Sequence, residues 1–384
     1  MTLKTAGISI SNEVVIKTFA EPIDKVIKGG FTMLTKGVVI YGQEDFRYED
    51  IELPDPAEGE VLVEIESCGI CAADPKIYYG NAYFAQVAYD HAPIVAGHEF
   101  MGRVMKLGPG SGEKYGLKEG DRAIAENIVP CGECYWCKRG QYNLCDPHAV
   151  FGIVEYNGGW AKHMIYPKGS IVHKVPENVS WSDAAVIEPC ACALHGVNRA
   201  RIQFGETVVV LGCGPIGMFM MQGARLKNPR QVIAVDLDDH RLEIAKDLGA
   251  DIIINPSKED PVEKVKSVTE EGIGCDVVLE AAGNNKSVKA GIDMLRRGGR
   301  LMEFSVFAEE VSFDWSIISD IKELEIIGGH LGYHTYKPTI DFMSRGLITS
   351  RGIASDPHSL VDFKKAIDIS KGREHGSIKV LMQP

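Results

Sequence analysis

The chain has 384 residues, of which 45% are hydrophobic and 24% charged, a composition typical of a folded protein with two or three domains. It excludes a disordered chain, a coiled coil and a small disulfide-stapled protein. Lysine and arginine number 41 and aspartate and glutamate 53, so the net charge of −12 makes a nucleic-acid backbone a poor partner.

Residues 1–33 precede the first predicted strand, and we interpret them as an N-terminal extension. They lack the apolar core of a signal peptide. No apolar run in the chain approaches the ~20 residues that cross a bilayer. We therefore expect no membrane partner and a cytoplasmic location, where clustered cysteines bind metal more often than they form disulfides.

Two kinds of hydrophobic pattern divide the rest of the chain. From about residue 34 to 189 apolar and polar residues alternate, as in 60–66, and this predicts an antiparallel, β-rich domain with one solvated face. Further along, the apolar runs are uninterrupted and suit parallel strands buried on both faces, at 208–211, 232–235, 277–279 and 301–304. Helix-like segments separate these runs, at 218–227, 239–248 and 286–297. The alternation predicts a doubly wound α/β domain.

A glycine-rich hexapeptide, GCGPIG at 212–217, follows the first of these runs and opens a helix-like segment. In this context the motif predicts a dinucleotide site, because Gly212 permits a tight turn, Gly214 lets the backbone approach a pyrophosphate, and Gly217 permits close helix–strand packing. The N-terminus of the helix would face the phosphate. The only competing interpretation is a structural turn. The residues predicted to bind the cofactor are Gly212, Gly214, Pro215, Ile216, Gly217 and Asp236.

Asp236 follows the second apolar run, 19 residues after Gly217. Its carboxylate would accept hydrogen bonds from a ribose hydroxyl and repel a 2′-phosphate, so NAD is favoured over NADP. Arg241 lies too far along the next helix-like segment to be an obvious phosphate clamp.

Four of the ten cysteines lie within 15 residues, at Cys131, Cys134, Cys137 and Cys145. This spacing predicts a closed tetrahedral zinc site that folds the loop and does no chemistry. The alternatives are an iron–sulfur cluster and four unmetallated thiols. Zinc is preferred because nothing else in the chain suggests electron transfer.

A second group of potential ligands is spread along the first domain: Cys68, Cys71, Asp74, His98, Glu99 and Glu188. With the four-cysteine loop and the glycine motif in this order, the chain from 34 to 384 resembles the zinc-dependent medium-chain dehydrogenase/reductase superfamily. The Glu188-Pro189 pair resembles its polyol and threonine branch. The resemblance implies a GroES-like catalytic domain at 34–194 and 335–384, a Rossmann domain at 195–334, NAD, and two zinc ions per chain.

In that family, Cys71 and His98 would be ligands of the catalytic zinc, with Glu99 or Glu188 as the third. Asp74 is expected to orient His98 without itself binding the zinc. Family members usually carry a hydroxyl two residues after the zinc cysteine to start a proton relay, but here Ala73 stands there. We therefore expect the proton to leave through zinc-bound water coupled to Glu188. Other routes remain open, through Lys76, Tyr78, Tyr79 or Glu99.

The resemblance further implies a substrate pocket near the turn 327–333. Polar side chains there, Lys76, His330 and Tyr333, favour a polyhydroxylated substrate over an apolar alcohol. The segment 78–84 would form a pocket edge or pack in the core. The preferred function is NAD-dependent oxidation of a small polyol of the erythritol or threitol type to a ketose.

Other substrates remain open: sorbitol or xylitol, an inositol derivative, and L-threonine. A zinc- and nucleotide-binding protein without activity is an alternative of a different class. The resemblance also implies a homodimer or homotetramer assembled through the nucleotide domain.

Overall fold

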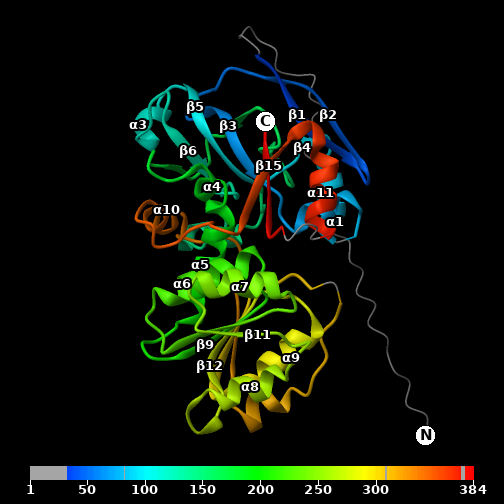
Figure 1. The fold of residues 1–384 in the computed structure, drawn as a ribbon. Coiled ribbons are helices and arrows are strands. Elements are labelled where there is room, and N and C mark those ends of the chain that lie inside the picture. The colour runs from blue at the N-terminus through cyan, green and yellow to red at the C-terminus, as the bar shows by residue number, and fades with distance from the viewer. Residues whose placement is uncertain (1–32, 82, 308, 373–376) are drawn as a thin grey trace, which may run out of the picture.

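The computed structural model describes residues 33–81, 83–307, 309–372 and 377–384. Apart from Met33, the predicted N-terminal extension lies outside the described residues. The chain forms two lobes, with helix α5 (Ile187–Ala200) lying between them (Figure 1).

The β-rich upper lobe is built on two sheets. The smaller has the strand order β2 (Asp45–Leu53), β1 (Met33–Gly42), β4 (Ile94–Val95) and is antiparallel throughout. In the larger sheet β7 (His163–Tyr166) pairs with one half of β3, and the main order is β15 (Ala354–Ser359), β16 (Lys379–Gln383), β3 (Val61–Gly69), β5 (Glu99–Leu107), β6 (Arg122–Ala125), β8 (Val172–Lys174). Only β15 and β16 run parallel to each other.

The end of the chain returns to this lobe. Strand β16 pairs antiparallel with β3, with Leu381 opposite Gly69 and Met382 opposite Cys68. The last strand therefore lies beside the segment that leads into Cys71. Helices of this lobe are α1 (Ala73–Tyr78), α2 (Tyr83–Asp90), α3 (Ser111–Tyr115), α4 (Trp181–Ala184) and α11 (Phe363–Gly372), while α10 (Tyr336–Ser344) packs on α5.

The lower lobe confirms the predicted doubly wound fold. Its six strands are all parallel, in the order β11 (Ile252–Ile254), β10 (Gln231–Val235), β9 (Thr207–Leu211), β12 (Cys275–Glu280), β13 (Leu295–Glu303), β14 (Glu325–Gly328). This is the 3-2-1-4-5-6 order of dinucleotide-binding folds, which reverses direction next to β9. The intervening helices are α6 (Pro215–Arg225), α7 (Asp239–Asp247), α8 (Pro261–Ser267) and α9 (Asn285–Met294).

Both faces of the parallel sheet are buried, which explains its uninterrupted apolar strands. On β9, Val208 and Val210 belong to a core shared with α5 and α6, whereas Val209 and Leu211 face a second core shared with α8 and α9. All four are at most 2% exposed. Because successive side chains of a strand point to opposite faces, a strand covered on both sides is apolar at almost every position.

One predicted element is too long. The helix expected at 286–297 begins correctly, since Asn284 caps the N–H groups of Lys286 and Ser287, but it ends at Met294. Leu295 has an extended backbone and pairs with Cys275 of β12. Pairing with the neighbouring strand therefore overrides the local helical pattern.

Candidate active site and metal centres

The end of β3 and the start of β5 form the first candidate metal site. Gly69 and Glu99 face each other across these antiparallel strands, so Cys71 lies close to the pair His98 and Glu99. One ligand atom from each of these three side chains lies within 4.8 Å of the others. His98 and Glu99 are buried, and Cys71 is partly exposed. The structure therefore brings three of the predicted ligands together.

Asp74 supports two members of this group. Its Oδ2 accepts the backbone N–H of Cys71 at 2.7 Å, and its Oδ1 lies 3.7 Å from His98 Nδ1, too far for a hydrogen bond. Burial raises the pKa of Asp74 to about 6, against the opposing effect of His98. His98 Nδ1 is buried without a hydrogen-bond partner among the described residues.

Glu188 lies in the first turn of α5, outside that group of three. Its Oε1 accepts two hydrogen bonds, from Asn127 Nδ2 at 2.6 Å and from Cys192 Sγ at 3.3 Å. Burial, and then the nearby charge of Glu99, raise the pKa of Glu188 to about 7. The structure therefore separates the roles of the two carboxylates: Glu99 lies among the candidate ligands, and Glu188 is held beside them.

A buried lysine of the last strand completes the site. Lys379, only 3% exposed, forms an ion pair with Glu99 and donates a hydrogen bond to the Ile70 carbonyl at 2.9 Å. Lys379 supplies one positive charge to a buried group that contains three carboxyl groups, Asp74, Glu99 and Glu188. A thiolate, an imidazole and a carboxylate form a donor set that suits zinc with an open position for substrate.

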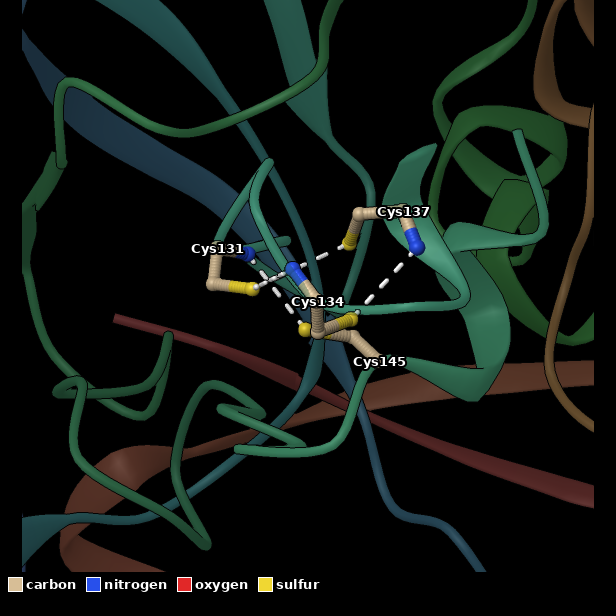
Figure 2. Close-up of side chains that lie close together, drawn as sticks. All are labelled: Cys131, Cys134, Cys137 and Cys145. Carbon is tan, nitrogen blue, oxygen red and sulfur yellow. Dashed lines mark hydrogen bonds between the residues drawn. The ribbon is translucent and has the colours of Figure 1, made fainter. Parts of the chain in front are cut away.

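The four-cysteine loop forms the second candidate metal site. Its sulfur atoms converge (Figure 2), all within 4.8 Å of one another, and Cys131 Sγ lies 4.0 Å from Cys137 Sγ. Zn–S bonds of 2.3 Å in a tetrahedron place sulfurs about 3.8 Å apart. The backbone N–H of Cys137 donates to Cys134 Sγ and, as the largest cause, lowers the pKa of that thiol to about 6. The loop fits a closed metal site.

The glycine motif has the geometry that dinucleotide binding requires. Gly212 has a φ of +91°, and a Cβ on Gly217 would lie 1.8 Å from the Gly212 carbonyl oxygen. Gly214 caps the N-terminus of α6. Asp236 follows β10, where its Oδ2 accepts the N–H of Cys213 at 2.7 Å and so links the two strand ends. Arg241 is engaged elsewhere, since it donates to the Ser377 carbonyl at 3.3 Å.

A cavity of about 590 Å³ lies against the second half of α5. His330 and Tyr333 line it, as do His195 and Arg199 of α5, but none of Cys71, His98, Glu99 or Glu188 does. Helix α5 connects Glu188 with this cavity, because residues 188, 192, 195 and 199 follow one face of the helix. Burial lowers the pKa values of His195 and His330 to about 4, so both imidazoles are neutral near pH 7.

The other predicted pocket residues lie elsewhere. Tyr78 is in the core, with its ring 5.1 Å from that of Phe46. Tyr79 hydrogen-bonds Asp368 of α11. Lys76 lines no described cavity. Within the described part of 78–84, these tyrosines therefore pack against α11 and the core, and Ala82 lies outside the described residues.

Sequence reasoning missed three residues that shape the site: Asn127, Cys192 and Lys379. Cys192 of α5 donates to Glu188, and it belongs to neither group of potential metal ligands in the sequence. Lys379 was detectable in principle, because a single lysine followed by the apolar run 380–382 indicates a buried charge that needs a partner. No pattern marks Asn127.

The described residues include no helix long and apolar enough to span a membrane. Comparison with known proteins identifies two domain families. The model of the alcohol dehydrogenase GroES-like domain matches residues 57–177, and that of the zinc-binding dehydrogenase matches residues 215–345.

Relatives match over nearly their whole length. The chain is 41% identical to an erythritol/L-threitol dehydrogenase of Mycolicibacterium smegmatis, over 91% of this chain and 97% of that protein. It is 30% identical to a sorbitol dehydrogenase of Bacillus subtilis, over 91% and 97%. A solved structure described as a zinc-binding dehydrogenase of Sinorhizobium meliloti, bound to NADP, has a TM-score of 0.83 at 28% identity and covers 92% of this chain and 100% of that one. The chain therefore belongs to the zinc-dependent medium-chain dehydrogenases, in their polyol dehydrogenase branch, and is an oxidoreductase that acts on CH–OH groups.

Proposed function

We propose that this enzyme oxidises a secondary hydroxyl of a small polyol, of the erythritol or threitol type, to a ketose with NAD as the acceptor. The observation that carries this proposal is the 41% identity to an erythritol/L-threitol dehydrogenase over 97% of its length. The buried polar groups around Glu188 support it, because they require hydroxyl partners rather than an apolar chain.

The reaction moves a hydride and a proton in different directions. The carbon that bears the hydroxyl gives its hydride to the nicotinamide, the hydroxyl gives up its proton, and the products are ketose, NADH and H⁺. A zinc ion held by Cys71, His98 and Glu99 would act as a Lewis acid that favours loss of the hydroxyl proton. Asp74 accepts the backbone N–H of Cys71, and Lys379 pairs with the Glu99 carboxylate. The Glu188 carboxyl, with a pKa of about 7, is suited to take up and release a proton near neutral pH.

The proposal includes two zinc ions per chain, one in this site and one in the four-cysteine loop. It also includes assembly into a homodimer or homotetramer through the nucleotide domain. Strand β14 supports that assembly, because it lies at the edge of the described parallel sheet and Ile326 on it is 43% exposed.

A substrate panel tests the proposed reaction. With NAD, the highest kcat/KM is expected for erythritol or threitol, then for sorbitol and xylitol, with ethanol at least about 100-fold lower, because the hydroxyl-binding groups would be left without partners. Inositol and L-threonine complete the panel, and formation of NADH is measured. Activity with ethanol and none with any polyol would overturn the proposal.

Asp236 tests the cofactor. Replacing it with serine is expected to lower kcat/KM for NAD by roughly 10- to 100-fold, because charge-assisted hydrogen bonds to ribose hydroxyls are lost, and to raise the NADP/NAD ratio. Initial rates with each cofactor measure both effects. Asp239→Asn is the control, since Asp239 is exposed and contacts Lys258 and Asn255 rather than the glycine turn. A variant with an unchanged cofactor ratio would show that Asp236 acts only through its bond to Cys213.

A further inference from the structure

The amide group of Asn127 is buried, and among the described residues its nitrogen has a hydrogen-bond partner but its oxygen has none. The residue is 1% exposed. Its Nδ2 donates to Glu188 Oε1 at 2.6 Å, whereas its Oδ1 receives no hydrogen bond from any described residue. Buried amide oxygens in folded proteins are nearly always hydrogen-bonded, so this atom requires an explanation.

The hydrogen bonds of Glu188 indicate which end of the Asn127 amide faces it. Glu188 Oε1 accepts hydrogen bonds from Cys192 as well as from Asn127, and an ionised carboxylate can only accept, so the NH₂ end of Asn127 faces Glu188 and the oxygen faces away. The residue is also fixed at its backbone: its N–H donates to the Tyr336 hydroxyl at 3.1 Å, and its carbonyl accepts the N–H of Phe151 at 3.1 Å. The unpartnered oxygen therefore has a set position.

That position lies beside the catalytic group. The C–N and C=O bonds of an amide add to about 2.6 Å, so Oδ1 lies within about 5 Å of Glu188 Oε1. Glu188 in turn interacts electrostatically with His98 and Glu99. A hydrogen-bond donor that approaches Asn127 Oδ1 would therefore lie beside the Glu188 carboxyl group.

We propose that Asn127 determines specificity by accepting, at Oδ1, a hydrogen bond from the substrate hydroxyl on the carbon adjacent to the one oxidised. The site then takes vicinal diols and polyols, because a monohydric alcohol leaves the oxygen buried and unpaired. The inference rests on the proposed polyol oxidation and adds the residue that recognises the second hydroxyl.

Two substrates that differ by one hydroxyl test this inference: 2,3-butanediol and 2-butanol. Wild-type enzyme is expected to prefer the diol. In Asn127→Leu, which keeps the size and removes both polar ends, the ratio of kcat/KM for diol over mono-alcohol is expected to fall at least about tenfold, mainly through KM. Zinc per chain and the thermal midpoint confirm that the variant is intact.

A second variant separates the two ends of the amide. Asn127→Asp keeps an oxygen at the Oδ1 position and replaces the amide donor to Glu188 by a carboxyl oxygen, which can bond Glu188 only when the two groups share a proton. It is expected to lower the rates with both substrates by a similar factor and to keep the diol preference within about threefold of wild type. Calorimetric titration of the enzyme–NADH complex with erythritol supplies a readout without turnover: Asn127→Leu is expected to weaken this binding at least about tenfold and to leave NADH binding unchanged.

The outcomes distinguish two failures. If wild-type enzyme shows no preference for diols or polyols, the proposed function itself is wrong. If wild type prefers the diol and Asn127→Leu loses activity equally with both substrates, Asn127 only positions Glu188, and the inference is overturned. An unchanged diol preference in that variant, together with unchanged erythritol binding, would overturn it as well.

Discussion

Replacing Cys71 with alanine is expected to remove one of the two zinc ions proposed for each chain and to lower kcat/KM by at least about 1000-fold. Cys71 is one of three side chains whose ligand atoms lie within 4.8 Å of one another, and two protein ligands hold zinc poorly. Lewis-acid assistance contributes several kcal/mol to such reactions, and about 4 kcal/mol corresponds to a 1000-fold change in rate. Metal analysis of the purified protein and steady-state kinetics measure the two effects.

Cys68→Ala is the matched control. Cys68 is the same residue type three positions earlier, fully buried in β3, and its thiol donates to the Gly69 carbonyl. Its loss is expected to cost roughly 1 kcal/mol of stability through a small cavity and to leave two zinc ions and most of the activity. If Cys71→Ala retained both zinc ions, the assignment of the catalytic ligands would be wrong.

The second large effect is expected in the four-cysteine loop. Cys137→Ser should remove the other zinc ion and lower the thermal midpoint by about 10 °C, since a loss near 3 kcal/mol shifts a large domain by 2–4 °C per kcal/mol. The loop packs against Leu331 and Tyr333, and Tyr142 within it accepts the N–H of His334 at 3.0 Å. Disorder in the loop therefore reaches the wall of the 590 Å³ cavity, and KM is expected to rise.

Glu133→Gln serves as the control for the loop, because Glu133 is exposed between two of the cysteines and contributes no sulfur. Its zinc content and thermal midpoint should match those of wild type. A Cys137→Ser protein that still held two zinc ions and melted at the wild-type temperature would contradict a structural metal site here. Iron in place of zinc in the wild-type protein would favour the cluster alternative.

Parts of the molecule governed by local pattern were predictable from the sequence. The glycine motif encodes its own geometry, since Gly212 and Gly217 meet constraints within six residues. The four parallel strands predicted were readable as apolar runs because both of their faces are covered. The candidate metal site of the four-cysteine loop was equally predictable, because all of its potential ligands come from 15 consecutive residues.

Features that depend on contacts between residues far apart in the sequence were not predictable. The choice between Glu99 and Glu188 as the carboxylate nearest Cys71 follows from the register of β3 against β5, which no local pattern states. Asn127 acquires a role only because α5 brings Glu188 within 2.6 Å of it, 61 residues later in the chain. The helix predicted at 286–297 was too long for the same reason, since Leu295 pairs with β12 as the first residue of a strand.

The pairing of β16 with β3 has a consequence for how the enzyme is made. Glu99 and its partner Lys379 are 280 residues apart, and the whole parallel sheet, from residue 207 to 328, is synthesised between them. The nucleotide lobe can therefore fold during translation before Lys379 has been made, whereas the Glu99–Lys379 ion pair cannot form until then. The catalytic group is thus completed after the nucleotide lobe, and a variant that lacks β16 is expected to keep the parallel sheet and to lose the partner of Glu99.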